Sequence, residues 1–395
     1  MIAADRAVQR PPDARLLVVD GAGRLDERPS ALTHAPRARW IEFLRRGDVV
    51  VANDAATLPA SLTGLHARSG RPIELRLAAW RGGTRAALAF DALLFGGGDY
   101  RIRTEARALP PPVATGDTLA LGPLVARVMR TLGHPRLLRV RFDGPPNAFW
   151  RGLAAHGRAI QYAHLAEPLA LWDAWTPIAT EPAAFESPSA GFILAWSDIA
   201  ALAAQRIGFA TLTHAAGLSS TGDETLDARL PLDEWYRIPK RTAATIDQAK
   251  SRGGRVIAIG TTVVRALEHA AHAKGHVRAG VRRARGRIGA TTTLRVVDGL
   301  VTGTHEPGSS HHELLRAFAG DDVLRAAAAE LDAHGYRTHE FGDSMLVFSD
   351  ARASGTARPA PLDTRRSRPA CCCCGFRLPP AAAASARAPL RTAPD

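Results

Sequence analysis

The sequence predicts an α/β domain interrupted by an antiparallel β-barrel, and three observations support this prediction. The chain has 395 residues, enough for one large or two ordinary domains. Short segments with period-two hydrophobicity follow one another between residues 57 and 143, a pattern typical of a small barrel. Strand and helix patterns alternate on both sides of that region. We therefore expect an α/β domain over 1–56 and 151–350, an inserted barrel over 57–150, and a disordered tail over 351–395.

The N-terminal part predicts two strands with a short helix between them. The apolar runs at 15–20 and 48–53 are typical of buried strands, and residues 37–45 of a helix. In the barrel region, segments 73–77 and 138–142 alternate apolar and charged residues along their length. Such alternation indicates strands with one face in a core and one face in water.

The C-terminal part returns to the α/β rhythm. Ser310 and Glu313 form a predicted capping box, and the Arg- and Gly-rich segment 276–290 predicts a mobile loop. Gly253 and Gly335 are expected to end helices, because glycine readily adopts the left-handed conformation found there. The expected helices are 196–206, 242–252, 262–273, one opening at 310 and one at 321–335, and the expected strands are 210–213, 256–259, 294–297 and 345–348.

The most informative local pattern is a strand, a tight turn at Gly260 and a helix that opens on two hydroxyl residues. Thr261 or Thr262 is expected to cap the first N–H groups of that helix. The same N–H groups, at the positive end of the helix dipole, also suit a carboxylate or phosphate. The turn alone leaves both interpretations open.

Four segments in a fixed order carry a family resemblance. Residues 236–268 read YRIPKRTAATIDQAKSRGGRVIAIGTTVVRALE, residues 296–302 read VVDGLVT, residues 341–346 read FGDSML, and residues 47–54 read GDVVVAND. They resemble the segments YxIPxxTAxxIxxAKxxGGRVIAVGTTSVRxLE, VVDGLxTNFHLP, YGDAML and GDxLVxND of the S-adenosylmethionine:tRNA ribosyltransferase-isomerases of queuosine biosynthesis. The resemblance extends over nearly all of residues 13–348.

This resemblance implies the same fold, a β-barrel inserted into an α/β domain. It also implies a reaction in which the ribosyl part of S-adenosylmethionine moves onto a 7-aminomethyl-7-deazaguanine base in tRNA. The ribose then rearranges to an epoxycyclopentanediol, with loss of adenine and methionine. S-adenosylmethionine and tRNA are thus the implied substrates, and no metal is implied because the sulfonium supplies the electrophilic activation.

The resemblance also implies site residues at the turn. Thr261, Thr262 and Arg265 match the family's GTTSVR and are expected to bind the carboxylate of S-adenosylmethionine, with Arg265 as a bidentate fork. The alternative for Arg265 is a surface ion pair with Glu268.

Asn53 and Asp54 match the family's N-D and end a strand, which indicates a role in binding S-adenosylmethionine. An Asx turn leading into the barrel is the structural alternative for them. His305 matches the family's TNFHLP and is expected to act as the catalytic base. We expect no metal at His305, because Pro307 follows closely and prevents the helix that a paired histidine site needs.

Three loops depart from the family pattern. The family's APTAGLHF is SPSAGFIL at residues 187–194, which lacks the histidine, and its HVGLGTFRPV is HAAGLSSTGD at 214–223, which lacks Phe-Arg. Its PGY motif before VVDG is absent and is replaced by RGRIG at 285–289, and the arginine of its D-T-R is missing after Asp54. Two alternatives therefore stay open: a catalytically silent RNA- or nucleoside-binding paralogue, and an S-adenosylmethionine-using enzyme with another acceptor.

The composition indicates which partners and which cellular compartment to expect. The net charge is +13, of which the tail after residue 350 contributes +6, so the remaining +7 is compatible with tRNA. All four cysteines are adjacent, at 371–374, and lack the C-x-x-C spacing of a zinc site. There is no signal-peptide pattern and no apolar run near 20 residues. We expect a cytoplasmic monomer without a membrane partner.

Overall fold

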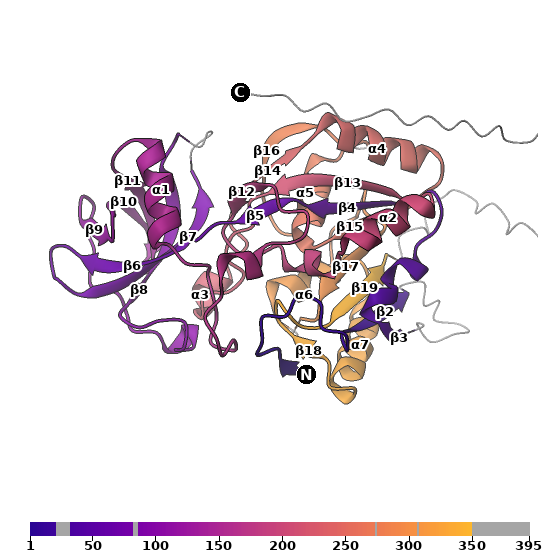
Figure 1. Cartoon of the computed structure of the whole chain (residues 1–395), viewed down its shortest axis with the longest axis horizontal. Coiled ribbons are helices and arrows are strands. Elements are labelled where there is room, and N and C mark those ends of the chain that lie inside the picture. Colours follow the sequence, from indigo (N-terminus) through magenta and orange to yellow (C-terminus); the bar gives the residue numbers. More distant parts are fainter. Residues whose placement is uncertain (21–31, 82–85, 273–274, 306–307, 350–395) are drawn as a thin grey trace, which may run out of the picture. The chain divides into compact units, whose positions relative to one another are not determined.

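The computed structural model describes residues 1–20, 32–81, 86–272, 275–305 and 308–349. Within these residues a closed six-stranded antiparallel barrel, in the order β10-β11-β8-β7-β6-β9, is inserted into an α/β fold (Figure 1). The predicted fold class is therefore confirmed. The barrel strands are β6 Ser61–His66, β7 Pro72–Trp80, β8 Ala89–Gly96, β9 Thr118–Leu121, β10 Leu124–His134 and β11 Leu137–Phe142.

The α/β part is built on a nine-stranded mixed sheet in the order β16-β14-β13-β4-β15-β17-β19-β2-β3. Its four central strands β13, β4, β15 and β17 are parallel to one another, whereas β14 and β19 on either side of them are antiparallel to β13 and β17. These nine strands are β2 Arg15–Asp20, β3 Leu32–Pro36, β4 Val49–Asn53, β13 Gly208–His214, β14 Glu234–Ile238, β15 Val256–Ile259, β16 Gly280–Ala284, β17 Gly299–Gly303 and β19 Ser344–Phe348.

Helices and short strands complete the structure. The α-helices are α1 Pro146–His156, α2 Trp196–Ala204, α3 Glu224–Asp227, α4 Lys240–Ser251, α5 Thr261–Ala270, α6 Ser310–Leu315 and α7 Asp321–Ala333. The 3₁₀ helices are η1 Arg37–Phe43, η2 Thr104–Ala106, η3 Leu171–Ala174 and η4 Ser189–Ile193. Two small parallel pairs join β1 Ile2–Ala3 to β18 Arg337–Thr338, and β5 Ala55–Thr57 to β12 Glu181–Ala184.

The central strands are apolar throughout because the sheet is covered on both faces. In β4, Val49 and Val51 pack against α4, α5 and α7 in one cluster, whereas Val50 and Ala52 pack with η1 and α2 in another. Successive side chains of a strand point to opposite faces, so a run of apolar residues is buried from both sides. This explains why β15, with the sequence VIAI, is buried along its whole length.

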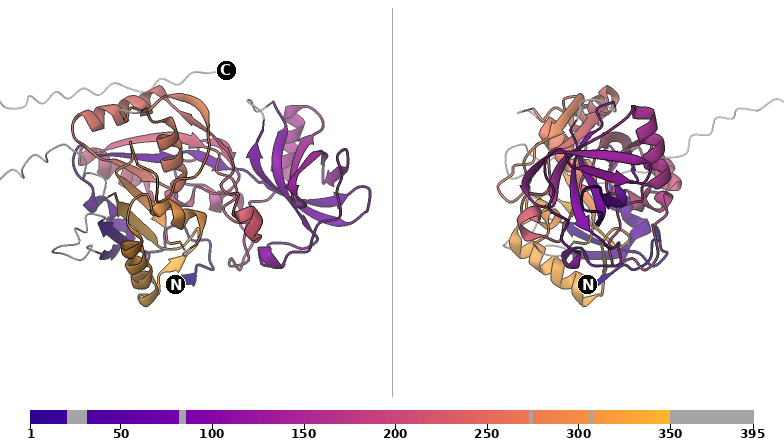
Figure 2. Two further views of the ribbon diagram at one scale, coloured as in Figure 1. Left: turned by 180° about the vertical axis from the view of Figure 1, so that it is seen from behind. Right: turned by 90° about the vertical axis from the view of Figure 1, so that its left-hand side faces the viewer.

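The barrel has a separate apolar core to which α1 contributes. Phe149 and Leu153 of α1 belong to the same buried cluster as Phe90 and Phe142, and the Phe142 and Phe149 ring centroids are 4.7 Å apart. Figure 2 shows α1 beside the barrel strands from two further sides. Since α1 spans residue 150, the barrel core receives side chains from both sides of the predicted boundary, and the domain limits stay a prediction.

The strand predicted at 294–297 is wrong, and the strand lies instead at β17. The backbone N–H groups of Arg295, Val296 and Val297 donate to the Glu268 carboxylate at 2.8, 3.0 and 2.9 Å. These donors are therefore unavailable to a sheet ladder. A side chain of α5 caps this segment, which the local pattern does not reveal.

The predicted mobile loop at 276–290 is also wrong in its central part. Residues Gly280–Ala284 form β16, which pairs antiparallel with β14 at the edge of the nine-stranded sheet. The capping box is displaced as well, because Ser309 rather than Ser310 caps α6 and accepts from His312 N–H at 3.1 Å. Most of the other predicted helices and strands are present within a few residues, and the helix at 37–45 is the 3₁₀ helix η1.

The predicted disordered tail, 351–395, lies outside the described residues, as do the cysteines within it. Among the residues that the structure describes, no helix has the length and apolar character required to cross a bilayer.

Candidate active site

A cavity of about 380 Å³ opens where the parallel strands β13, β15 and β17 end at their carboxyl ends. This edge is where ligands gather in α/β sheets. The segments that follow β12, β13, β15 and β17 contribute to its wall, together with α6 and the loop before β19. The polar and ionisable side chains that line it include Tyr162, Glu186, Ser219, Glu234, Thr261, Thr262, Arg265, His305, His311, His339 and Glu340.

The N-terminus of α5 forms one side of this cavity. Gly260 has a φ of +96°, a conformation that favours glycine, and it turns the chain from β15 into the helix. Neither threonine caps the helix, so that prediction is wrong: Gly260 is the N-cap residue and Thr261 begins the helix. Within the described residues, nothing accepts a hydrogen bond from the backbone N–H groups of Thr261 and Thr262, and these donors remain available to an anion.

Arg265 lines the cavity but already has an anionic partner. Its guanidinium forms a buried ion pair with Glu234 and also donates to the Leu232 carbonyl oxygen at 3.3 Å. The alternative pairing with Glu268 is wrong, because the Glu268 carboxylate is occupied by backbone N–H groups. Burial raises the pKa of Glu234 against the opposing effect of Arg265.

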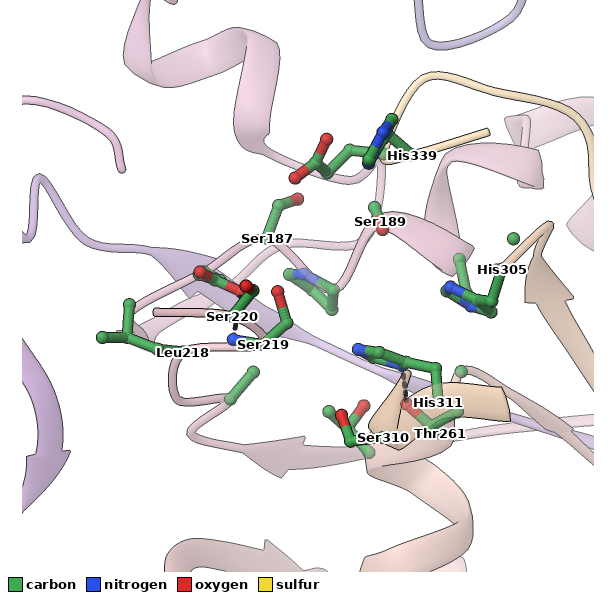
Figure 3. Close-up of a pocket in the computed structure, with 18 of the residues that line it drawn as sticks. Ser187, Ser189, Leu218, Ser219, Ser220, Thr261, His305, Ser310, His311 and His339 are labelled. Carbon is green, nitrogen blue, oxygen red and sulfur yellow. Dashed lines mark hydrogen bonds between the residues drawn. The ribbon is translucent and has the colours of Figure 1, made fainter. Parts of the chain in front are cut away.

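His305 and His311 lie together on another wall of the cavity (Figure 3). Their rings are stacked, with centroids 4.5 Å apart and planes at 11°. His305 Nε2 lies 2.9 Å from Thr302 Oγ1, and His311 Nδ1 lies 3.2 Å from Thr261 Oγ1. Burial, together with the neighbouring histidines, holds the pKa of His305 well below its ordinary value, and burial lowers the pKa of His311 to about 4. Both rings are therefore neutral at physiological pH.

Asn53 and Asp54 are not among the described residues that line the cavity. The Asn53 amide bridges β4 and β13: its Oδ1 accepts from Ala55 N–H at 3.1 Å, and its Nδ2 donates to the His214 carbonyl oxygen at 3.0 Å. Asp54 accepts from Thr213 Oγ1 at 2.7 Å. The contact with Ala55 is the Asx turn considered as the structural alternative. The structure does bring Asn53 beside one predicted site residue, because its Nδ2 donates to Thr262 Oγ1 at 3.5 Å, although neither Asn53 nor Asp54 lines the cavity.

Glu186 is a cavity-lining carboxyl group that forms no ion pair with a cationic side chain among the described residues. It accepts from the Tyr162 hydroxyl and, at 2.9 Å, from Ser219 N–H. Burial raises the pKa of Glu186 to about 7, and the negative charge of Glu340 adds to the increase. A carboxyl group with this pKa exchanges its proton near neutral pH, which is the property of a general acid or base.

Glu340 and His339 belong to the same cavity. His164 Nε2 lies 2.9 Å from Glu340 Oε2, and the His164 ring stacks on His339 with centroids 4.2 Å apart. Burial alone would raise the pKa of Glu340, but the hydrogen bond and charge of His164 hold it below the ordinary value. Of these two cavity carboxyl groups, Glu340 is therefore ionised at neutral pH and Glu186 is only partly ionised.

Comparison with known proteins shows what this arrangement is similar to. A family model described as queuosine biosynthesis protein matches residues 1–347. The chain belongs to that family.

The S-adenosylmethionine:tRNA ribosyltransferase-isomerase of Sorangium cellulosum is 35% identical over 370 residues, 86% of this chain and 94% of that protein. The protein of the same name from Gloeobacter violaceus is 33% identical, over 86% of this chain and 90% of its own length. The crystal structure of S-adenosylmethionine tRNA ribosyltransferase from Thermotoga maritima aligns with 87% of this chain and 96% of that one, at 23% identity and a TM-score of 0.45.

The structure also locates the positions where this family member departs from the motifs. Ile193, in place of the motif histidine, is buried in the apolar cluster beneath the sheet and does not line the cavity. Thr221, in place of the motif arginine, donates to Asp227 at 2.6 Å, while Arg287 lines the cavity and donates to the Asp227 carbonyl oxygen at 3.1 Å. The Arg287 guanidinium therefore lines the cavity, whereas Thr221 does not.

Several cavity residues were not predicted from the sequence, among them Tyr162, Glu186, His311 and Glu340. Glu186 directly precedes the segment that matches APTAGLHF, and Glu340 precedes the segment that matches YGDAML. Position beside a matched motif was the signal available for both carboxylates. The sequence carried no comparable signal for Tyr162, because it enters the cavity from the loop after α1.

Proposed function

We propose that this protein transfers the ribosyl moiety of S-adenosylmethionine to a 7-aminomethyl-7-deazaguanine base in tRNA and isomerises it, forming the epoxyqueuosine precursor of queuosine. The observation that carries this proposal is the match to proteins of that name over 86% of the chain. The cavity supports it with groups suited to a substrate that has a cationic sulfonium, a carboxylate and a nucleoside.

The ribosyl donor, S-adenosylmethionine, is proposed to bind through its two charged groups, the methionine carboxylate and the sulfonium. The unpaired N–H groups of Thr261 and Thr262 suit the methionine carboxylate, since they lie at the positive end of the α5 dipole. The ionised carboxylate of Glu340 suits the sulfonium. Arg265 is proposed to contribute through its remaining N–H groups, because Glu234 already neutralises its charge.

The chemistry requires a base that removes a proton from the carbon next to the sulfonium sulfur. We assign this role to Glu186, whose pKa of about 7 leaves a usable fraction of carboxylate at neutral pH. The proton moves from the carbon to the Glu186 carboxylate, while Tyr162 and Ser219 hold that group by their hydrogen bonds. His305 is proposed as a second proton-transfer residue, present as a neutral imidazole.

The experiment is to incubate the full chain with S-adenosylmethionine, with and without tRNA that carries 7-aminomethyl-7-deazaguanine, and to measure adenine. Adenine release that depends on this tRNA is expected. No release would favour the catalytically silent paralogue, and release independent of this tRNA would favour a different acceptor. In the active protein, His305→Ala is expected to lower the rate about 10²–10⁴-fold and to leave binding of S-adenosylmethionine nearly unchanged.

Because tRNA is a cytoplasmic molecule, we infer that the protein acts in the cytoplasm. Its expected monomeric state and the expected lack of a metal requirement in the reaction stay predictions. The positive charge of the chain supports an RNA partner through attraction to phosphates.

A further inference from the structure

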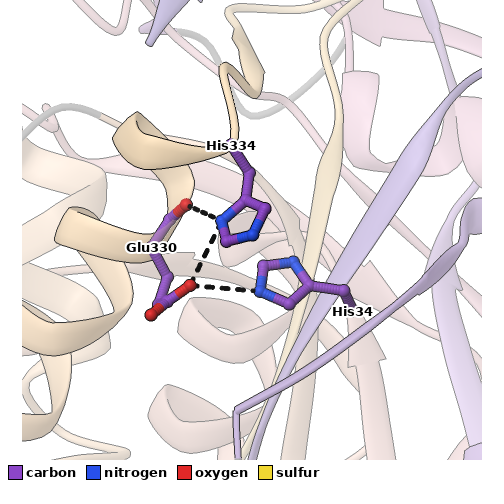
Figure 4. A group of neighbouring side chains, drawn as sticks. All are labelled: His34, Glu330 and His334. Atoms are coloured by element: carbon purple, nitrogen blue, oxygen red, sulfur yellow. Dashed lines mark hydrogen bonds and ion pairs between the residues drawn. The ribbon is translucent and has the colours of Figure 1, made fainter.

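Two imidazoles and one carboxylate converge outside the cavity, at the end of α7. Glu330 lies in the last turn of α7 and His334 directly follows that helix, so one turn separates them and their side chains share a face. His34 comes from β3, the edge strand of the nine-stranded sheet (Figure 4). One potential ligand atom from each residue lies within 4.8 Å of the others.

The spacing of the group matches a tetrahedral ion site. The same Glu330 oxygen lies 3.3 Å from His34 Nε2 and 3.2 Å from His334 Nδ1. Bonds of about 2.0–2.1 Å from zinc to nitrogen or oxygen place neighbouring ligand atoms of a tetrahedron roughly 3.3 Å apart. Little movement is therefore needed for all three residues to bind one ion.

The orientation of the rings also permits a shared ion. A metal bound to an imidazole lies close to the plane of the ring, on the nitrogen lone pair. The His34 and His334 planes are inclined by 39°, so they intersect. The second His/Glu group with close ligand atoms, in the cavity wall, differs here: the His164 and His339 rings are within 10° of parallel and stacked.

A buried tyrosine holds the His34 ring in place. The Tyr336 hydroxyl lies 3.3 Å from the Leu16 carbonyl oxygen and 2.9 Å from His34 Nδ1. In the tautomer in which His34 Nδ1–H donates to the tyrosine oxygen, the lone pair is on Nε2, which faces Glu330. An outer hydrogen bond of this kind is a common feature of metal-binding histidines.

The surroundings of the three residues affect how readily a cation binds there. His334 Nδ1–H donates to the Glu330 carbonyl oxygen at 2.9 Å, and an ion bound at Nδ1 would replace that proton. The Arg15 guanidinium lies 4.2 Å from the Tyr336 ring centroid, and its charge is countered by Asp343 at 3.0 Å. A surface hollow of about 460 Å³ beside His34 and His334 gives access from solvent.

We propose that His34, Glu330 and His334 form a zinc site that links the end of α7 to the edge strand β3. Imidazole nitrogens favour zinc and similar transition metals, whereas magnesium and calcium favour all-oxygen sites. Three protein ligands leave a fourth position for water. The role of the ion is structural, because it joins His34 to Glu330, which is 296 positions later in the sequence. The zinc site is independent of the proposed reaction.

The test is isothermal titration of the full chain with zinc after treatment with a chelator. The protein carries Ser in place of Cys371, Cys372, Cys373 and Cys374, because four adjacent thiols would bind zinc themselves. One zinc ion per chain is expected. His34→Gln and His334→Gln are expected each to weaken binding at least about tenfold, since loss of an outer partner alone costs about 10–100-fold.

The matched control is His134→Gln. His134 faces a single carboxylate, Asp223, at 3.2 Å and has no second histidine in its group, so this change should leave zinc binding unaltered. Tyr336→Phe should weaken binding without changing the stoichiometry, because it frees the His34 ring to rotate. Zinc should raise the unfolding temperature of the parent and the control, but not of His334→Gln. Absence of binding in the parent, or equal affinity in the parent and His34→Gln, would overturn the proposal.

Discussion

The wall of the barrel and the wall of the cavity each hold a buried carboxyl group, and the two groups have opposite environments. Glu74, on β7, accepts from Arg76 Nε at 2.6 Å and from Ser61 Oγ at 2.7 Å, and it also pairs with Arg107. Burial alone would raise its pKa, but these two arginines hold the pKa of Glu74 below its ordinary value. Glu186 has hydroxyl and amide donors instead, and its pKa rises to about 7.

The difference separates a structural carboxylate from a chemical one. A carboxylate held by two guanidinium groups keeps its charge and stabilises the barrel only as part of that set. A carboxyl group that is buried without a cation changes charge near neutral pH and is available for proton transfer. The following predictions test this comparison.

The largest effect is expected for Glu186→Gln. This change removes the proposed base but keeps the shape of the side chain, so tRNA-dependent adenine release should fall about 10²–10⁴-fold. Glu340→Gln is the matched control in the same cavity, since it removes an ionised carboxylate that we do not propose as the base. It should weaken donor binding and keep a pH-dependent rate whose midpoint moves to lower pH, because the charge of Glu340 contributes to the raised pKa of Glu186. A Glu186→Gln protein as fast as wild type would exclude Glu186 as the base.

Glu74→Gln should act on stability rather than chemistry. It leaves the Arg76 and Arg107 guanidinium groups buried without their carboxylate, and arginine cannot lose its proton. The free energy of unfolding in urea should fall by about 3–5 kcal/mol, while the folded protein keeps its rate of adenine release. Glu42→Gln, at the exposed pair with Arg39, should leave the urea midpoint unchanged. Comparable losses in both variants would contradict the proposed contrast.

Arg265→Ala should destabilise the protein less than Glu74→Gln does. The Glu234 carboxyl group that remains can bind a proton, because burial already raises its pKa. We expect a loss of about 3 kcal/mol in urea unfolding at pH 7, with a smaller loss as the pH is lowered, because the raised pKa of Glu234 favours its neutral form. Binding of S-adenosylmethionine, measured by calorimetry, should weaken by about 1.5–3 kcal/mol if the remaining N–H groups of Arg265 contact its carboxylate. Unchanged affinity would remove Arg265 from the binding site.

The smallest effect concerns the pH dependence of stability. The ordinary pKa of a glutamate is 4.5, and the folded state raises the pKa of Glu186 to about 7. Between these values the folded protein holds a proton that the unfolded chain releases. This contribution is therefore complete below about pH 4.5 and is lost as pH rises through 7, by up to about 3 kcal/mol. Unfolding curves at pH 5 and pH 8 should show the loss in wild type and not in Glu186→Gln. The rate of adenine release should rise over the same range.

The sequence predicted part of the site because part of it is local. Thr261, Thr262 and Arg265 follow one strand within one turn of helix, and the structure brings them to the same cavity as His305. The sequence could not predict that Arg265 pairs with Glu234, since that partner is 31 residues away on β14. Nor could it predict that Asn53 bonds to β13, because this contact depends on which strand is the neighbour of β4.

The sequence by itself determined the fold class and most of the elements, because hydrophobic period, glycine turns and motif order are properties of neighbouring residues. Only the tertiary structure decided the protonation states of Glu74, Glu186 and His305. A pKa depends on burial and on charges within a few ångströms, and folding brings these together from distant segments. The same reason explains the failed strand at 294–297: the side chain that removed its donors, Glu268, lies on another element.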